Sequence, residues 1–288
     1  MAGIGAALVV KLRKMSGQGM MDCKKALEEA NGNLDEAMAI LRKKGLSTLA
    51  KREERETNEG AIAGKSAEGG KVAVLASLCC ETDFVTRSDD FVAAAEKLAD
   101  YALACKADEG ADNVLQTSIE GVKYGDLVTE VAGKTGEKIA VGDYAKFRLD
   151  GPGLISTYIH FNKKVGTMVE IWTSDEGVAG SEEVKRIAAD IAMHITATKP
   201  IALDQSGVSA ETVAKEREIA AAQVKNKPAN IIDKIVEGKI RKFFAESCLL
   251  EQQFVKDNTK TVAQVLAESA QKAGGTGKIK RYVRFEVG

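Results

Sequence analysis

The sequence predicts an α+β protein with three parts: an N-terminal unit of three helices, two related α/β subdomains, and an antiparallel helical hairpin inserted into the second subdomain. Near the start of the chain, apolar residues recur at helical spacing. At two later places, a run of alternating apolar residues precedes a run with helical spacing. A charged, alanine-rich segment follows the second of these places. The expected domains are 1–55 (helical unit and charged linker), 56–142 and 143–288, with the hairpin at about 205–245.

Residues 4–46 form the helical unit, in which glycine-containing breaks at 15–19 and 31–33 separate three apolar stripes. Asn and Gly tolerate positive φ, so the second break is expected to be a turn. Three short helices with a Met-Ser-Gly-Gln-Gly loop resemble the ubiquitin-associated (UBA) fold, which predicts a docking module without naming its ligand. The charge-dense run 42–59 then indicates a solvated helix or linker. The helices are expected around Leu8 and Leu12, at 22–30 and at 34–41.

A strand, a loop and a helix are expected in the first α/β unit. Residues 72–79 alternate as a strand does, and a Glu-Gly-Gly signal joins them to an earlier strand at 61–64. Residues 89–105 repeat apolar side chains at helical spacing behind Ser88, which occupies a favourable N-cap position. Residues 82–87 are therefore expected to form a strand-to-helix loop.

The same unit occurs twice. Residues 59–106 resemble residues 152–199 without a gap, at a constant offset of 93, which indicates one supersecondary unit used twice. Phe84 in the loop aligns with Gly177, so the shared scaffold does not require an aromatic residue there. A phenylalanine at such a corner usually belongs to the core, and the comparison leaves a core residue and a displayed functional residue as equal alternatives. Aligned pairs include Gly60 with Gly153, Ile62 with Ile155, Ser88 with Ser181 and Ala95 with Ala188.

The second subdomain is expected to contain three strands and a covering helix, because a strand pair needs its apolar face covered. A last alternating run at 282–287 is expected to complete its sheet. Between these, Ser209 is expected to cap a helix over 210–226, Lys227-Pro228 to turn the chain, and residues 231–244 to return as the second helix of the hairpin. The other elements lie near 144–149, 155–161, 165–172 and 184–195, with Pro200 as terminator.

Several classes of function are not supported by the sequence. The net charge of −1 disfavours bulk binding to nucleic acid or to an anionic membrane. Two GK[ST] triplets, at 64–66 and 133–135, lack the upstream glycine at phosphate-loop spacing. The two histidines, His160 and His194, form no zinc pattern, and His194 is expected to be packed or capped on its helix. We therefore expect no enzyme activity, no cofactor, no metal and no direct nucleotide binding.

Cysteine usage and the N-terminal residues indicate a cytoplasmic protein. The five cysteines are odd in number and contain no CxxC pair, which suits a reducing compartment better than a disulfide framework. Residues 1–10 lack the basic and long apolar regions of a signal peptide, and no membrane span is expected. The sequence leaves a homodimer open.

Ordered segments across essentially the whole chain resemble the bacterial translation elongation factor Ts family. Each segment is short, and their joint occurrence in this order makes the resemblance specific. The last residue of the sequence is Gly288, and we expect no additional C-terminal helical module of the kind that some members have. The segments are MSGQGMMDCKKAL at 15–27, TDFV at 82–85, AMH at 192–194, KP at 199–200, VEGK at 236–239, QFV at 253–255, KTV at 260–262 and RFEVG at 284–288.

The resemblance implies a UBA-like domain, a core of two related subdomains and an inserted coiled coil. It further implies binding to GDP-bound elongation factor Tu, displacement of Mg²⁺ and exchange of GDP for GTP. Phe84 would be the wedge, Asp83 would accept hydrogen bonds from the partner, and Thr82 and Val85 would hold the turn. Met20, Met21 and His160 would add partner contacts, although Phe161 follows His160 where relatives often carry glycine. The alternative, supported by residues 4–46 alone, is an adaptor for ubiquitin-like proteins.

Overall fold

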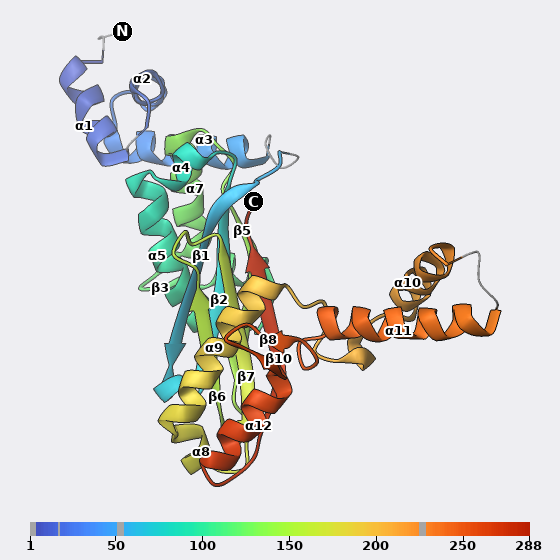
Figure 1. Cartoon of the computed structure of the whole chain (residues 1–288). Helices are drawn as coiled ribbons and strands as arrows, with labels where there is room; N and C mark the ends of the chain where they lie inside the picture. Colours follow the sequence, from blue (N-terminus) through green and yellow to red (C-terminus); the bar gives the residue numbers. More distant parts are fainter. Residues whose placement is uncertain (1–3, 17, 51–54, 225–228) are drawn as a thin grey trace.

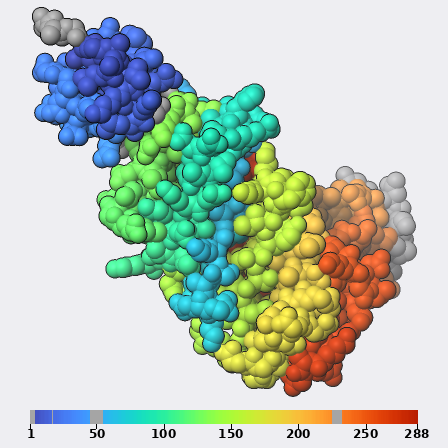
Figure 2. All heavy atoms as spheres, turned by 90° about the vertical axis from the view of Figure 1, so that its left-hand side faces the viewer, coloured from blue at the N-terminus to red at the C-terminus, as the bar shows by residue number. Residues whose placement is uncertain are grey.

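The computed structural model describes residues 4–16, 18–50, 55–224 and 229–288. Two three-stranded antiparallel sheets pack face to face, and helices cover the outer face of each (Figure 1). The N-terminal helices form a separate lobe at one end of an elongated molecule (Figure 2). This arrangement confirms the predicted α+β class, with a three-helix unit ahead of two α/β layers.

The N-terminal unit contains α1 (Ala6–Ser16), α2 (Met20–Glu29) and α3 (Leu34–Ala50) around a small apolar core. The predicted turn is confirmed, because Asn31 and Gly32 both have positive φ. Helix α3 runs past its predicted end and into the charged run, since Arg42, Lys43 and Lys44 directly after Leu41 are good helix formers. It contacts α7, which joins this lobe to the first subdomain (Figure 1). Residues 51–54 of the charged run lie outside the described residues.

The first sheet has the order β1-β2-β5, and the central strand β2 (Val72–Cys80) is buried on both faces. Its even-numbered side chains pack under α5 (Asp89–Ala104) and α7 (Tyr124–Thr135). Ala73 and Leu75 face the second sheet instead. The other elements are β1 (Glu59–Ala67), η1 (Glu68–Gly70), α4 (Asp83–Thr86), α6 (Ala111–Gln116), β3 (Ser118–Ile119), β4 (Val122–Lys123) and β5 (Ala140–Arg148).

The predicted strand at 144–149 overlaps β5, which ends at Arg148, but its assignment to the second subdomain's sheet is wrong. β5 pairs antiparallel with β2, in register Ala76 with Tyr144. Tyr144 packs in the core under α5, whereas Phe147 faces the space between the sheets. Both faces of β5 are therefore buried, and its hydrophobic pattern alone does not identify the neighbouring strand.

The second sheet has the order β10-β7-β6, and the predicted final strand is confirmed as the one that completes it. Helices α9 (Glu182–Thr198) and α12 (Val262–Lys272) cover its outer face. Arg281 on this sheet pairs with buried Glu170 at 2.7 Å and lies 4.0 Å over the Phe147 ring of the first sheet. The other elements are β6 (Gly153–Ile159), β7 (Val165–Thr173), α8 (Glu176–Gly180), η2 (Gln205–Gly207), β8 (Gln253–Phe254), β9 (Asp257–Thr261) and β10 (Gly277–Glu286).

The internal repeat is confirmed element by element. Strands β2 and β7 have bounds that differ by the offset of 93 found in the sequence, and each is followed by a short helix and then a long one. The aligned positions 60 and 153 both require glycine, Gly60 and Gly153, for the same structural reason. A Cβ at Gly60 would lie 2.2 Å from the Leu78 carbonyl oxygen, and one at Gly153 would lie 2.4 Å from that of Ile171.

Helices α10 (Ala210–Ala222) and α11 (Ala229–Ser247) form the inserted hairpin, which projects from the side of the sheets (Figure 1). Ser209 caps α10 as predicted, accepting a hydrogen bond from the Thr212 amide. A short seam of Ala220, Val236 and Ile240 packs between the helices. The predicted turn at Lys227-Pro228 lies outside the described residues.

The crowding at Gly153 predicts that alanine substitutions at two nearby glycines differ in their effect on stability. Gly153→Ala should lower the free energy of unfolding by about 1–3 kcal/mol, because the new methyl group cannot fit against the strand backbone. Gly151→Ala is the matched control, since nothing lies within 4 Å of its Cβ position. Urea unfolding of both variants tests this; equal midpoints for the two would contradict the proposed close approach.

Candidate functional site

Phe84 lies at the end of the first sheet, on the single-turn helix α4 (Asp83–Thr86). The sequence predicts a loop at 82–87, and the structure differs by folding four of these residues into a helical turn. The turn is held by local hydrogen bonds: the Thr86 hydroxyl donates to the Asp83 carbonyl at 2.7 Å, and the Ser88 hydroxyl donates to the Val85 carbonyl at 2.8 Å. Ser88 then caps α5 through the Phe91 amide, as predicted.

The Phe84 ring is 80% exposed, which rejects the core interpretation of this residue. Its neighbour Val85 is buried against the cluster under α5. Successive residues of a helical turn point about 100° apart, so the anchoring of Val85 turns Phe84 towards solvent. Large apolar side chains favour the interior, and so an almost fully exposed ring on an ordered corner is available for contact with another molecule.

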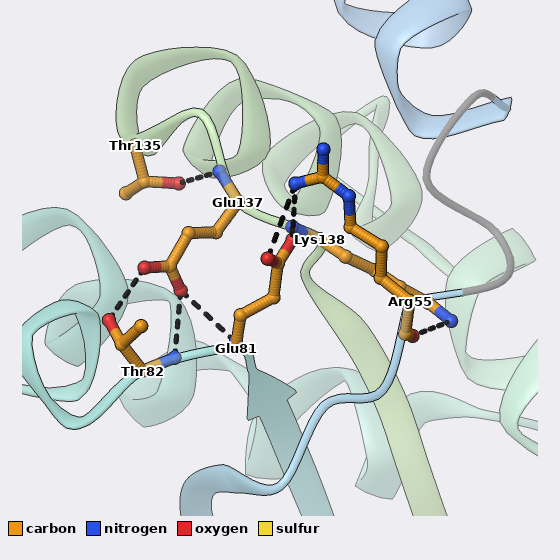
Figure 3. Close-up of polar contacts among 6 residues, drawn as sticks. All are labelled: Arg55, Glu81, Thr82, Thr135, Glu137 and Lys138. Carbon is orange, nitrogen blue, oxygen red and sulfur yellow. Dashed lines mark hydrogen bonds and ion pairs between the residues drawn. The ribbon is translucent and has the colours of Figure 1, made fainter.

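Thr82 and Asp83 make their contacts within the chain. The Thr82 hydroxyl donates to a Glu137 carboxylate oxygen at 2.6 Å (Figure 3). Asp83 pairs with Arg87 at 2.9 Å. The Asp83 pair is solvent-exposed, so it is worth less than about 1 kcal/mol and Asp83 can exchange Arg87 for another donor at little cost. Thr82 and Val85 thus hold the turn, while Asp83 and Phe84 face outwards.

Glu137 is the residue of this site that sequence reasoning missed. It lies in the turn between α7 and β5, directly after Gly136, whose left-handed backbone ends α7. One of its oxygens accepts hydrogen bonds from the amides of Glu81 and Thr82, both at 3.0 Å (Figure 3). The only sequence signal was the Gly-Glu pair at a helix end, which gives no indication of a partner 55 residues earlier.

The other predicted contact residues lie on two different parts of the molecule. Met20 and Met21 are exposed on α2 in the N-terminal lobe. His160 follows β6, with its Nδ1 atom 3.0 Å from the Tyr158 hydroxyl and its ring 4.4 Å from that of Phe161, which is 88% exposed.

A groove of about 490 Å³ connects the His160 region to the corner that carries Phe84. Its walls come from β1, α5 and the turn after β6, and Thr86 of α4 lies at its edge. The groove therefore brings His160 and α4 onto one surface, whereas neither methionine of α2 lines it. The lining side chains that matter here are Ile62, Thr86, Val92, Ala95, His160 and Phe161.

Neither phosphate-loop triplet has the required setting. Residues 64–66 lie inside strand β1, and residues 133–135 end helix α7, whereas a phosphate loop joins a strand to the start of a helix. Within the described part of the chain, no group of three or more His, Cys, Asp or Glu side chains could hold a metal ion. His194 is buried as predicted; it bonds Gln252 at 2.9 Å, and burial lowers its pKa.

The helices of the described residues are all too short or too polar to cross a membrane. The five cysteines are all free thiols, and four of them are buried.

The fold and the site define a class of protein that presents apolar side chains on a rigid two-sheet scaffold, which is typical of protein–protein recognition. The sequence model described as "Elongation factor TS" matches residues 81–288. Elongation factor Ts of a Nitratiruptor species is 43% identical over 287 residues, which are 99% of this chain and 93% of the relative. That of Chlorobium phaeobacteroides is 38% identical over 294 residues and covers 100% of both chains.

The chain therefore belongs to the elongation factor Ts family. It is a translation elongation factor and takes part in protein biosynthesis. The predicted family resemblance is confirmed over nearly the whole length.

The opposite orientations of Phe84 and Val85 predict unequal effects on stability when each is truncated. Phe84→Ala should change the free energy of unfolding by less than about 0.5 kcal/mol, because the ring is already in water. Val85→Ala should cost about 2 kcal/mol, because it removes buried methyl groups and leaves a cavity. Thermal and urea unfolding of both variants measure this. A large loss for Phe84→Ala would mean that the ring is buried.

Proposed function

We propose that the chain binds elongation factor Tu in its GDP-bound form, displaces Mg²⁺ from the nucleotide site and promotes release of GDP, so that GTP can enter. Family membership supports the partner. The observation that carries the proposal is the 80% exposed ring of Phe84 on a corner whose backbone is fixed by its own chain. The residues assigned to this contact are Thr82, Asp83, Phe84 and Val85, with Met20, Met21 and His160 as additional contacts.

The ring can act without any bond chemistry of its own. Mg²⁺ demands near-ideal octahedral geometry and bridges the nucleotide phosphates to protein oxygens in a GTPase. A rigid aromatic side chain pushed between the helices around that site would move them by about an ångström, a displacement large enough to spoil the coordination. The Asp83 carboxylate would then exchange Arg87 for donors on the partner and fix the inserted corner.

The energetics require more than one ring. Burial of a phenylalanine contributes about 2 kcal/mol, whereas changing a 1:99 equilibrium to 99:1 needs roughly 5.5 kcal/mol. The groove between α5 and His160, together with the exposed methionines of α2, would supply the remaining contact area. Because coupling is reciprocal, GDP must weaken binding of the chain by the same factor by which the chain weakens binding of GDP.

This proposal assigns no enzyme activity, cofactor or directly bound nucleotide to the chain. Its site of action is the cytoplasm, where translation takes place. Only the three-helix architecture of the N-terminal lobe supports the alternative of an adaptor for ubiquitin-like proteins, and family membership across the rest of the chain does not favour it.

The direct test is release of fluorescent GDP from elongation factor Tu. Phe84→Ala should lower the stimulated release rate by about tenfold to thirtyfold, which corresponds to the burial energy of one ring. Ile219→Ala, which truncates a half-exposed apolar residue on the projecting α10, is the control and should stay near the parent rate. A parent-like rate for Phe84→Ala would reject the wedge, and no stimulation by the unmodified chain would reject the exchange function.

A further inference from the structure

We propose that Glu137 is a positioning residue that holds the Phe84 corner in its displayed conformation. Its carboxylate receives three hydrogen bonds from the segment that leads into α4: the amides of Glu81 and Thr82 donate to one oxygen, and the Thr82 hydroxyl donates to the other (Figure 3). Hydrogen bonds to a carboxylate are stronger than neutral ones. The residues that Glu137 contacts, Glu81 and Thr82, lie just before the turn that carries Phe84. Loss of these contacts would therefore change the direction in which the Phe84 ring points.

The second copy of the repeat shows why the first needs this contact. Asp175 occupies the position of Thr82 and caps its own short helix α8 by accepting from the Val178 amide at 3.0 Å. Thr82 makes no such cap on α4. Its hydroxyl is turned away, towards Glu137. The start of the turn that carries Phe84 is therefore anchored by a carboxylate from another part of the chain, whereas the start of the turn that carries Gly177 is capped by its own Asp175.

Glu137 is itself held from both sides. Its amide donates to the Thr135 hydroxyl at 3.3 Å, and the next amide, that of Lys138, donates to a Glu81 carboxylate oxygen at 2.6 Å. The two segments thus exchange hydrogen bonds in both directions, as the two sides of a capping box do. Arg55 also contacts Glu81 at 3.3 Å, and its carbonyl accepts from the Lys138 ammonium at 2.9 Å (Figure 3). The segment from the N-terminal lobe therefore meets the same cluster.

The positioning role of Glu137 rests on the proposed exchange function for its biological meaning. The hydrogen bonds between Glu137 and the segment before α4 can nevertheless be tested without the partner. Glu137→Ala should speed hydrogen exchange of the Glu81 and Thr82 amides by about tenfold, because both lose their acceptor. Glu137→Gln should keep their protection within about twofold. The glutamine carbonyl can accept both amides, and its NH₂ group can donate to the Thr82 hydroxyl oxygen. Unchanged exchange in Glu137→Ala would overturn the proposal whatever happens to GDP release.

The second arm measures GDP release from elongation factor Tu. Glu137→Ala should lower the stimulated rate of GDP release by about tenfold, and Glu137→Gln should lower it by less than about twofold. The double variant Phe84→Ala with Glu137→Ala should release GDP no more slowly than Phe84→Ala alone, because Glu137 acts through the ring. Glu130→Ala, which removes an exposed carboxylate of α7, is the control. Multiplicative losses in the double variant, or a glutamine variant as poor as the alanine variant, would overturn the proposal.

Folding is checked for each variant by its thermal midpoint. Thr82→Val keeps both amide contacts with Glu137 and removes the hydroxyl contact alone. It should therefore lose less of the stimulated GDP release than Glu137→Ala does, even if Glu137→Ala is unstable. An equal or larger loss for Thr82→Val would argue against the carboxylate as the anchor. If the unmodified chain does not accelerate GDP release at all, the exchange function fails, and the amide measurement still decides the position of Glu137.

Discussion

The burial of strand β2 on both faces is the constraint on which the rest of the structure depends. One face packs under α5 and α7, and the other packs against the second sheet. A strand so enclosed ends at a fixed position and direction, and α4 follows directly from that end. Val85 continues the burial into the turn, and Phe84 is exposed as a consequence. The packing of the core thus fixes the backbone that carries Phe84, which explains how an exposed apolar side chain can have a defined orientation.

The two copies of the repeat carry different corners on the same scaffold. Their strands and helices match in position, and their first glycines meet the same carbonyl crowding. They differ at the corner: the second copy has Gly177 and a self-capped turn, and the first has Phe84 and a turn held by Glu137. The structural difference between the two copies is therefore concentrated in a few residues on a shared fold.

Local signals in the sequence predicted most of the elements. Ser88 and Ser209 cap helices where expected. The repeat left Phe84 as either a core residue or a displayed one, and its 80% exposure decides for the second. Long-range pairing was beyond these signals. The hydrophobic pattern of β5 is equally compatible with either sheet, and the contact between Thr82 and Glu137 joins segments with no shared periodicity. Single-turn helices such as α4 are too short to show a helical repeat of apolar residues.

The central claim is that Phe84 is exposed in the free chain and enclosed by elongation factor Tu in the complex. The most direct measurement is the ¹⁹F resonance of 4-fluorophenylalanine at position 84, recorded in H₂O and D₂O. The account predicts a solvent-dependent shift in the free chain, loss of that dependence on binding nucleotide-free elongation factor Tu, and its return when GDP is added. A solvent-insensitive resonance in the free chain, or one that does not change on binding, would contradict it.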